Sequence, residues 1–479
     1  MSIINIRKKS VVATIWSLVD NLSTQFLGVI IGIILARLLT PSDFGTVGVL
    51  AIFIGISTVF VDCGFATGLV RKKDRSEKDL STAFYFNVIV GLLAYLVLFL
   101  ISPLVASFFR MPILTKLLRI LALCLVFNSF SIVQNTILTA TLNIRVQAWI
   151  NVSTQFVMGC VGVYFAYQGY GVWTLVIQQV GSSILRCILL WCIGGWRPHS
   201  KWDEESFHYL FGFGWKLLGA NLIGTIFNQI HGFFIGRALG ANDLGLYSKA
   251  NDLSAKPNTT LLNMINRVAL PILAEVNNDI SQIKQAFSKM VRIGVFVSFP
   301  LFFLLIVIAE PLILIIWTSK WTGSIVLFQI LCVSASFGVV SQLGLTVMQL
   351  RNRTDLTLKY EFVKKPVTLI LLIMAMPFGL FYITLSAAVA SIYCSIVNMY
   401  ATKKLIGYSY REQIRDFLPY LLLSMISALI CFIIKDITDS VYISLLLRVV
   451  VFLSCYCSLA FILKLQGMRD IKSMINVNK

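Results

Sequence analysis

Long apolar runs separated by short polar connections make up most of this chain. A helix needs about 20 apolar residues to cross the hydrocarbon core of a bilayer, and about fourteen runs of this kind can be delimited. Lipid offers no partners to unpaired backbone groups, so each run is expected to be helical. We therefore predict an all-α polytopic membrane protein with spans near 11–37, 43–69, 81–103, 115–139, 147–168, 171–194, 211–238, 243–269, 287–309, 323–350, 358–377, 380–401, 417–435 and 441–463.

The composition agrees with this pattern. Hydrophobic residues make up 58% of the chain and charged residues 13%, whereas about a quarter of a soluble domain is charged. The net charge of +19 would suggest nucleic acid as a partner of a soluble protein. Here the basic residues cluster between apolar runs without a basic aromatic face, so we predict no binding to nucleic acid.

The sequence contains none of the short motifs typical of hydrolases, P-loop proteins, dinucleotide-binding enzymes or zinc proteases. Its ten cysteines all lie in apolar segments and none is in a CxxC pair, which is typical of packing residues. We therefore predict that the protein is not an enzyme and has no catalytic residues, no metal site and no cofactor.

Lysine and arginine are concentrated in alternate connections. Five of them lie between residues 71 and 78 and four between 403 and 415, whereas the opposite set of connections holds little beyond Arg110, Lys320 and Lys435. Positive residues stay on the cytoplasmic side of a membrane. Both termini are therefore predicted to be cytoplasmic, with an even number of spans.

Two segments 200 residues apart are similar. Residues 21–45 and 221–245 share eight identities in 25 aligned positions without a gap, and such internal repeats are common in transporters. The offset contains six spans, so the copies are expected to be parallel repeats. We predict an N-lobe at 1–200, a C-lobe at 201–410, and a C-terminal helix pair with a cytoplasmic tail at 411–479.

The repeat has a local structural interpretation. In the first copy, Arg37 is expected at a helix C-terminus, Asp43 as an N-cap and Gly45 at a close helix approach. Arg237, Asp243 and Gly245 repeat this pattern in the second copy. We therefore assign no substrate role to these residues.

The eighth predicted span is the most polar. Lys249, Asp252 and Lys256 lie at i, i+3 and i+7, which places them on one helix face. We interpret this face as a cavity wall, because a polar stripe is costly in lipid. The alternative is a Lys249–Asp252 ion pair, with the remaining polar side chains extending to the interface.

Other polar groups inside the spans are further candidates, because ionisable groups there are expensive. A predominantly basic cavity would suit an anionic cargo. The alternative for the lysines of the eleventh span is extension to the headgroups, and for the lone histidine a packing role. The substrate-binding candidates are Lys249, Lys256, Asn221, Lys216, Asn228, Lys364, Lys365, Asn21 and Gln25, and the coupling candidates are Asp20, Asp62, Asp252 and His231.

Two stretches resemble a known family. The run IILARLLTPSDFGTVGVLAIF and the following VDCGFATGLVRKKDRSEKDLSTAFYFN are similar to the colanic acid and teichuronic acid exporters. These belong to the polysaccharide transporters of the multidrug/oligosaccharidyl-lipid/polysaccharide flippase superfamily. The fourteen spans, the repeated motif and the polar eighth helix extend the resemblance over the chain.

The resemblance implies a flippase in the bacterial inner membrane. Its substrate would be an undecaprenyl-pyrophosphate-linked oligosaccharide, moved to the outer leaflet by alternating access through a basic central cavity. Such export serves exopolysaccharide, capsule or O-antigen biosynthesis, with membrane lipids, a polysaccharide polymerase and glycosyltransferases as partners. The alternative within the superfamily is a multidrug or cation-coupled extruder, which should have an acidic cavity.

Overall fold

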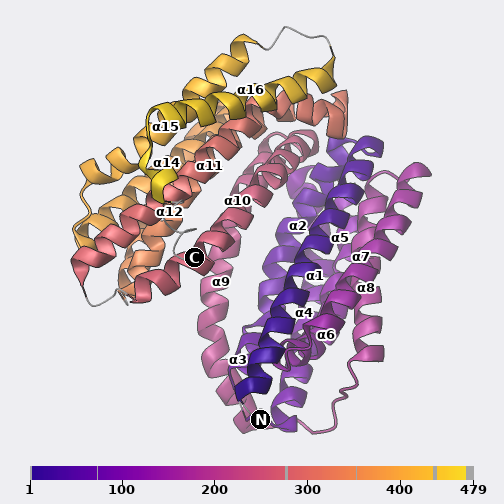
Figure 1. Ribbon diagram of the computed structural model, residues 1–479. Helices are drawn as coiled ribbons and strands as arrows, with labels where there is room; N and C mark the ends of the chain where they lie inside the picture. The colour runs from indigo at the N-terminus through magenta and orange to yellow at the C-terminus, as the bar shows by residue number, and fades with distance from the viewer. Residues whose placement is uncertain (1–2, 73, 276–278, 352, 435–439, 471–479) are drawn as a thin grey trace. The chain divides into compact units, whose positions relative to one another are not determined.

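The computed structural model describes residues 3–72, 74–275, 279–351, 353–434 and 440–470. Within these ranges all regular structure is helical, which confirms the predicted fold class (Figure 1). The helices are α1 (Ile3–Leu38), α2 (Pro41–Asp62), α3 (Phe65–Arg71), α4 (Glu77–Phe109), α5 (Ile113–Leu121), α6 (Leu123–Ala140), α7 (Ile144–Tyr167), α8 (Val172–Ile193), α9 (Glu204–Ala238), α10 (Ala241–Glu275), α11 (Ile280–Trp317), α12 (Ser324–Leu350), α13 (Thr354–Ala375), α14 (Leu380–Ile406), α15 (Tyr410–Ile433) and α16 (Val441–Ile462).

The helices correspond one by one to the predicted spans when α2 is joined to α3 and α5 to α6. Within the described residues, 12 helical segments are long and apolar enough to cross a membrane. The remaining two long helices, α10 and α13, carry the polar residues of the eighth and eleventh predicted spans. The protein is thus a multi-span membrane protein.

The break between α2 and α3 lies at two left-handed residues. Cys63 has φ 44° and Gly64 φ 73°, a region that glycine enters at little cost. A Cβ on Gly64 would lie 3.2 Å from the backbone of Gly214 in α9. Glycine therefore allows the turn after α2 to approach α9 closely.

The chain forms two compact units, residues 1–245 and 246–479. In the first unit α1 packs on α7, α2 on α9, α4 on α6, and α7 on α8. In the second unit α11 packs on α12, α15 and α16, and α12 packs on α14. The predicted lobes, with boundaries at residues 200 and 410, are a different division of the chain that rests on the sequence repeat. These boundaries stay a prediction.

The segment between α8 and α9 is attached to the start of α4. The indole Nε1 of Trp196 lies 3.0 Å from both carboxylate oxygens of Glu77, and the Asp203 backbone N–H donates to Thr82. Asp203 caps α9, and hydrogen bonds from Ser206 lower the pKa of its carboxyl. This connection is therefore part of the first unit.

The repeated motif differs in one respect from the prediction. Arg37 and Arg237 do lie in the last turns of α1 and α9. The N-cap of α2, however, is Thr40, and Asp43 is the N3 partner in a capping box. The prediction that Asp43 is the N-cap was wrong by three positions, because Thr40 can accept the hydrogen bond from the Asp43 N–H.

The two repeated glycines meet each other inside the first unit. A Cβ on Gly45 would lie 2.6 Å from the carbonyl carbon of Ala241, and one on Gly245 would lie 2.6 Å from that of Pro41. The backbones at the starts of α2 and α10 thus touch, as close helix approach at small residues requires. The predicted packing role of these glycines is confirmed.

Asp79 in the first turn of α4 is fully buried and pairs with Lys72 at 2.8 Å. Its carboxylate also accepts from the Ser76 backbone N–H at 2.8 Å. Replacing Asp79 with alanine removes both contacts and leaves Lys72 unpaired, so we expect a loss of about 3 kcal/mol. Thermal unfolding of the detergent-purified protein measures this loss. Asp74, an exposed neighbour, provides the control. Equal melting temperatures of the Asp79→Ala and Asp74→Ala variants would contradict the prediction.

Within the second unit, ion pairs connect α15 and the segment after α16 to α11. Arg292 in α11 pairs with Asp416 in α15 at 3.3 Å and with Asp470 after α16 at 2.8 Å. The Gly467 N–H donates to the Tyr420 hydroxyl at 2.8 Å. The segment after α16 is therefore attached to α11 and α15.

Candidate functional site: a polar cavity in the first unit

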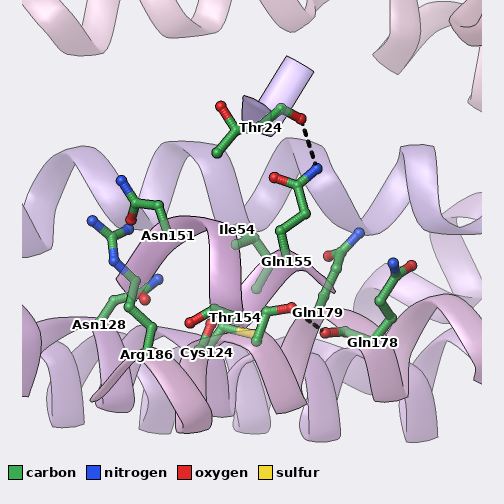
Figure 2. A pocket seen from close by; sticks show the side chains of 12 residues that line it. Thr24, Ile54, Cys124, Asn128, Asn151, Thr154, Gln155, Gln178, Gln179 and Arg186 are labelled. Atoms are coloured by element: carbon green, nitrogen blue, oxygen red, sulfur yellow. Dashed lines mark hydrogen bonds between the residues drawn. The ribbon is translucent and has the colours of Figure 1, made fainter. Parts of the chain in front are cut away.

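A cavity of about 670 Å³ lies between the helices of the first unit (Figure 2). This volume falls within the range of about 300–1,000 Å³ typical of small-molecule sites. Ten of its twelve lining residues have polar side chains, which carry five amides, four hydroxyls and one guanidinium. The lining residues are Thr24, Ile54, Cys124, Asn128, Asn151, Thr154, Gln155, Gln178, Gln179, Ser182, Ser183 and Arg186.

Helix α8 contributes the largest part of this wall. Gln178, Ser182 and Arg186 lie at i, i+4 and i+8, so they form one stripe along the helix. Helix α7 presents Asn151, Thr154 and Gln155 at i, i+3 and i+4, which places them on one helix face as well. The cavity is therefore built mainly from two neighbouring helices, with α1, α2 and α6 completing it.

Helix α1 closes the cavity through hydrogen bonds to α7. The Gln155 amide donates to the Thr24 backbone carbonyl at 3.0 Å, the contact drawn in Figure 2. The Asn151 amide donates to the Asp20 carboxylate at 3.1 Å and 3.4 Å. Asp20 is thus held beside the cavity by an amide of its wall.

Arg186 is the only charged residue among the side chains that line the cavity. Its Nη2 donates to the Asn135 side-chain oxygen at 3.2 Å, which also accepts from Gln147 at 2.9 Å. In Figure 2 the guanidinium lies beside the amides of Asn151 and Asn128. The cavity therefore has one cationic end and an otherwise neutral, hydrogen-bonding wall.

Among the candidates predicted on α1 and α9, Asp20 alone touches this wall. The Asn21 amide donates to the Ser17 carbonyl at 2.7 Å, within its own helix. The other four substrate-binding candidates on these helices do not line the cavity either, and all four are exposed: Gln25, Lys216, Asn221 and Asn228. Their predicted substrate contacts stay predictions.

Two further coupling candidates lie elsewhere in the first unit. Asp62 is the last residue of α2, and its carboxylate accepts a hydrogen bond from the backbone of Ala66 in α3. His231 is partly buried on α9 and does not line the cavity. Asp62 thus has a local structural function, and a coupling role for either residue stays a prediction.

In the second unit, the polar stripe of α10 is only partly buried. Lys249 is half-buried with its ammonium 6.0 Å from the ring centre of Trp317, while Asp252 and Lys256 are exposed. Asp252 interacts electrostatically with Lys249, so the alternative of an ion pair between these two residues stays open. The role of this stripe as a cavity wall stays a prediction.

The two candidate lysines of α13, Lys364 and Lys365, share one carboxylate. Lys364 is buried, pairs with Glu361 at 2.5 Å and donates to Asn398 in α14 at 3.3 Å. Lys365 pairs with the same Glu361 at 3.6 Å. Lys364 therefore connects α13 to α14, and the predicted substrate contact of either lysine stays a prediction.

The sequence interpretation missed most of the cavity. It concentrated on lysines, whereas the cavity contains an arginine and many amides on the fifth and sixth predicted spans. One signal was available: Gln178, Ser182 and Arg186 recur every four residues on a span that must face protein or water. The polar face of α7 with Asn151 and Gln155 is the matching signal on the neighbouring span.

The chemistry of the cavity wall indicates what kind of molecule the cavity can hold. Amides and hydroxyls both donate and accept hydrogen bonds, as the hydroxyls of a sugar ring do. Polar walls in a membrane protein mark a path for a polar substrate. Fold and cavity together therefore define a membrane transporter.

This chain belongs to the polysaccharide biosynthesis protein family, whose model matches residues 34–326. It is 23% identical over 354 residues to teichuronic acid biosynthesis protein TuaB of Bacillus subtilis (strain 168), covering 72% of each chain. It is 23% identical over 423 residues to lipopolysaccharide biosynthesis protein WzxC of Escherichia coli (strain K12), covering 87% of this chain and 86% of that protein. The family predicted from the sequence is confirmed.

The fold is similar to that of a solved flippase. The lipid II flippase MurJ in an inward closed conformation superposes with a TM-score of 0.73 and 16% identity, covering 94% of this chain and 98% of that one. At this identity the likeness shows a shared fold.

Proposed function

We propose that this protein moves an undecaprenyl-pyrophosphate-linked oligosaccharide from the cytoplasmic to the outer leaflet of a bacterial inner membrane. The observation that carries the proposal is the cavity of about 670 Å³, with its five amides, four hydroxyls and one arginine, in a chain of a polysaccharide biosynthesis family. The exported glycan would serve exopolysaccharide, capsule or O-antigen assembly. Glycosyltransferases would act before it and a polymerase after it.

The charge in the cavity favours this substrate over a cationic drug. A site for cations should carry carboxylates, because opposite charge offsets the desolvation of the bound ion. The cavity wall instead carries Arg186. A central cavity lined by the lysines of α10 and α13 is part of the same proposal and rests on the sequence.

The direction follows from charge. The distribution of lysine and arginine supports cytoplasmic termini. With an inside-negative potential, moving a negative charge outward is downhill by ~2.3 kcal/mol per charge per 100 mV. A diphosphate linkage carries two such charges, so the membrane potential supports export without a named coupling ion.

Deleting the gene for this chain is the direct test. We expect lipid-linked oligosaccharide to accumulate on the inner leaflet, because its synthesis continues while its export stops. Mass analysis of the extracted lipid identifies the species, and complementation with the intact chain should remove it. A deletion strain that exports its polysaccharide normally and accumulates no such lipid would overturn the proposal. Drug sensitivity without accumulation would support the extruder.

A further inference from the structure

Arg186 has hydrogen-bonding capacity that the protein does not use. A guanidinium carries five N–H donors in a planar fork, and the described residues supply a partner for Nη2 alone. The Nε atom is buried and has no hydrogen-bond partner among the described residues. A buried donor without a partner costs about 1–3 kcal/mol, so this geometry suggests that a ligand completes the site.

The nearest countercharge does not complete it. Asp20 acts electrostatically on Arg186, but Arg186 forms no ion pair among the described residues. The carboxylate of Asp20 is instead held by the Asn151 amide at 3.1 Å. The two charges are therefore separated, and the planar fork of Arg186 is not matched by a carboxylate of the protein.

The surrounding wall indicates what the ligand carries besides its charge. Asn128 and Asn151 lie beside the guanidinium in Figure 2, and the side chains of Gln178 and Gln155 lie further along the cavity. Thr154, also in the wall, has a buried hydroxyl without a hydrogen-bond partner among the described residues. Such a row of neutral donors and acceptors fits a polyhydroxyl body.

We propose that Arg186 binds an oxyanion carried by a saccharide, while the amides of the cavity bind the hydroxyls of the same molecule. The oxyanion is either the carboxylate of an acidic sugar or the phosphate that joins the glycan to its lipid. Both groups can accept two parallel hydrogen bonds from a guanidinium, in a bidentate pair. This inference rests on the proposed function and specifies the chemistry of its substrate.

Binding to the purified full-length chain in nanodiscs tests this assignment. Three probes separate the sources: a glucuronate-containing disaccharide, farnesyl pyrophosphate, and a neutral disaccharide. We expect at least one anionic probe to bind about tenfold tighter than the neutral one, because a hydrogen bond between charged groups is stronger than one to a neutral group. Preference for glucuronate alone identifies a sugar carboxylate, preference for farnesyl pyrophosphate alone identifies the phosphate, and preference for both supports the shared chemistry.

Variants of Arg186 then link the preference to this side chain. Arg186→Gln should remove the tenfold difference, and Arg186→Lys should keep part of it because the charge remains. Arg145→Gln is the matched control, since Arg145 is an exposed arginine at the start of α7, 5.4 Å from the ring of Trp16. Equal binding of anionic and neutral probes to the intact chain, or an unchanged preference in Arg186→Gln, would overturn the assignment.

This outcome is separable from the fate of the proposed function. If the deletion strain accumulates lipid-linked oligosaccharide while Arg186→Gln keeps its preference, only the role of Arg186 is lost. If the deletion strain exports normally, the flippase proposal fails whatever the probes show.

Discussion

Replacing Gly45 with alanine is expected to destabilise the protein strongly, because it forces apart the backbones at the starts of α2 and α10. The added Cβ would lie 2.6 Å from the carbonyl carbon of Ala241, and backbone, unlike the end of a flexible side chain, has little room to move. Overpacking costs about 1–3 kcal/mol in ordinary cores and more when backbone must shift. We expect a loss of about 3 kcal/mol, measured by thermal unfolding of the detergent-purified protein.

Two further variants make this prediction specific. Gly245→Ala should behave in the same way, because its Cβ meets the carbonyl of Pro41. Gly32→Ala is the control, since a Cβ there meets nothing within 4 Å, and alanine is favoured over glycine in a helix by about 1 kcal/mol. If the Gly45→Ala and Gly32→Ala variants had the same melting temperature, the close contact of α2 and α10 would not be needed for stability.

Reversing the charges of Lys249 and Lys256 together is expected to abolish export. If the stripe on α10 faces the anionic cargo, each reversal replaces attraction by repulsion. Two unit charges 4 Å apart interact by about 4 kcal/mol at an intermediate dielectric constant, enough to stop transport. Surface polysaccharide in a complemented deletion strain measures the effect.

The control for this pair is a lysine at a helix end. Lys404 is exposed in the last turn of α14, and Lys404→Glu should leave export near normal. Immunoblots of membrane fractions confirm that the double variant is inserted. Normal export in the Lys249→Glu/Lys256→Glu protein would remove both residues from the substrate path.

Much of the fold was predictable because it depends on local chemistry. The predicted and observed helices agree closely, for example 380–401 against Leu380–Ile406, because a run of apolar residues must be helical in lipid. The close contact at Gly45 was predictable as well, since the motif repeats with the same residue. The exact cap was not, because Thr40 and Asp43 could each serve until the backbone was known.

The candidate site was less predictable. The search for excess positive charge selected Lys364, yet that lysine is buried and paired with Glu361 at 2.5 Å. The same search passed over Arg186, whose single charge is surrounded by neutral amides. The sequence shows which charged residues lie inside membrane-spanning helices. Only the structure shows which ion pairs or hydrogen bonds stabilise each charge there.

The sequence by itself determined the class of membrane protein and the positions of its long helices, because hydropathy and helical periodicity are properties of consecutive residues. It also determined the family through the residues around Arg37 and Asp43. Only the tertiary structure decided which polar side chains share one cavity. Thr24 is far along the chain from Asn151 and Arg186, which lie on the consecutive helices α7 and α8, and packing of α1 on α7 and of α7 on α8 brings the three together.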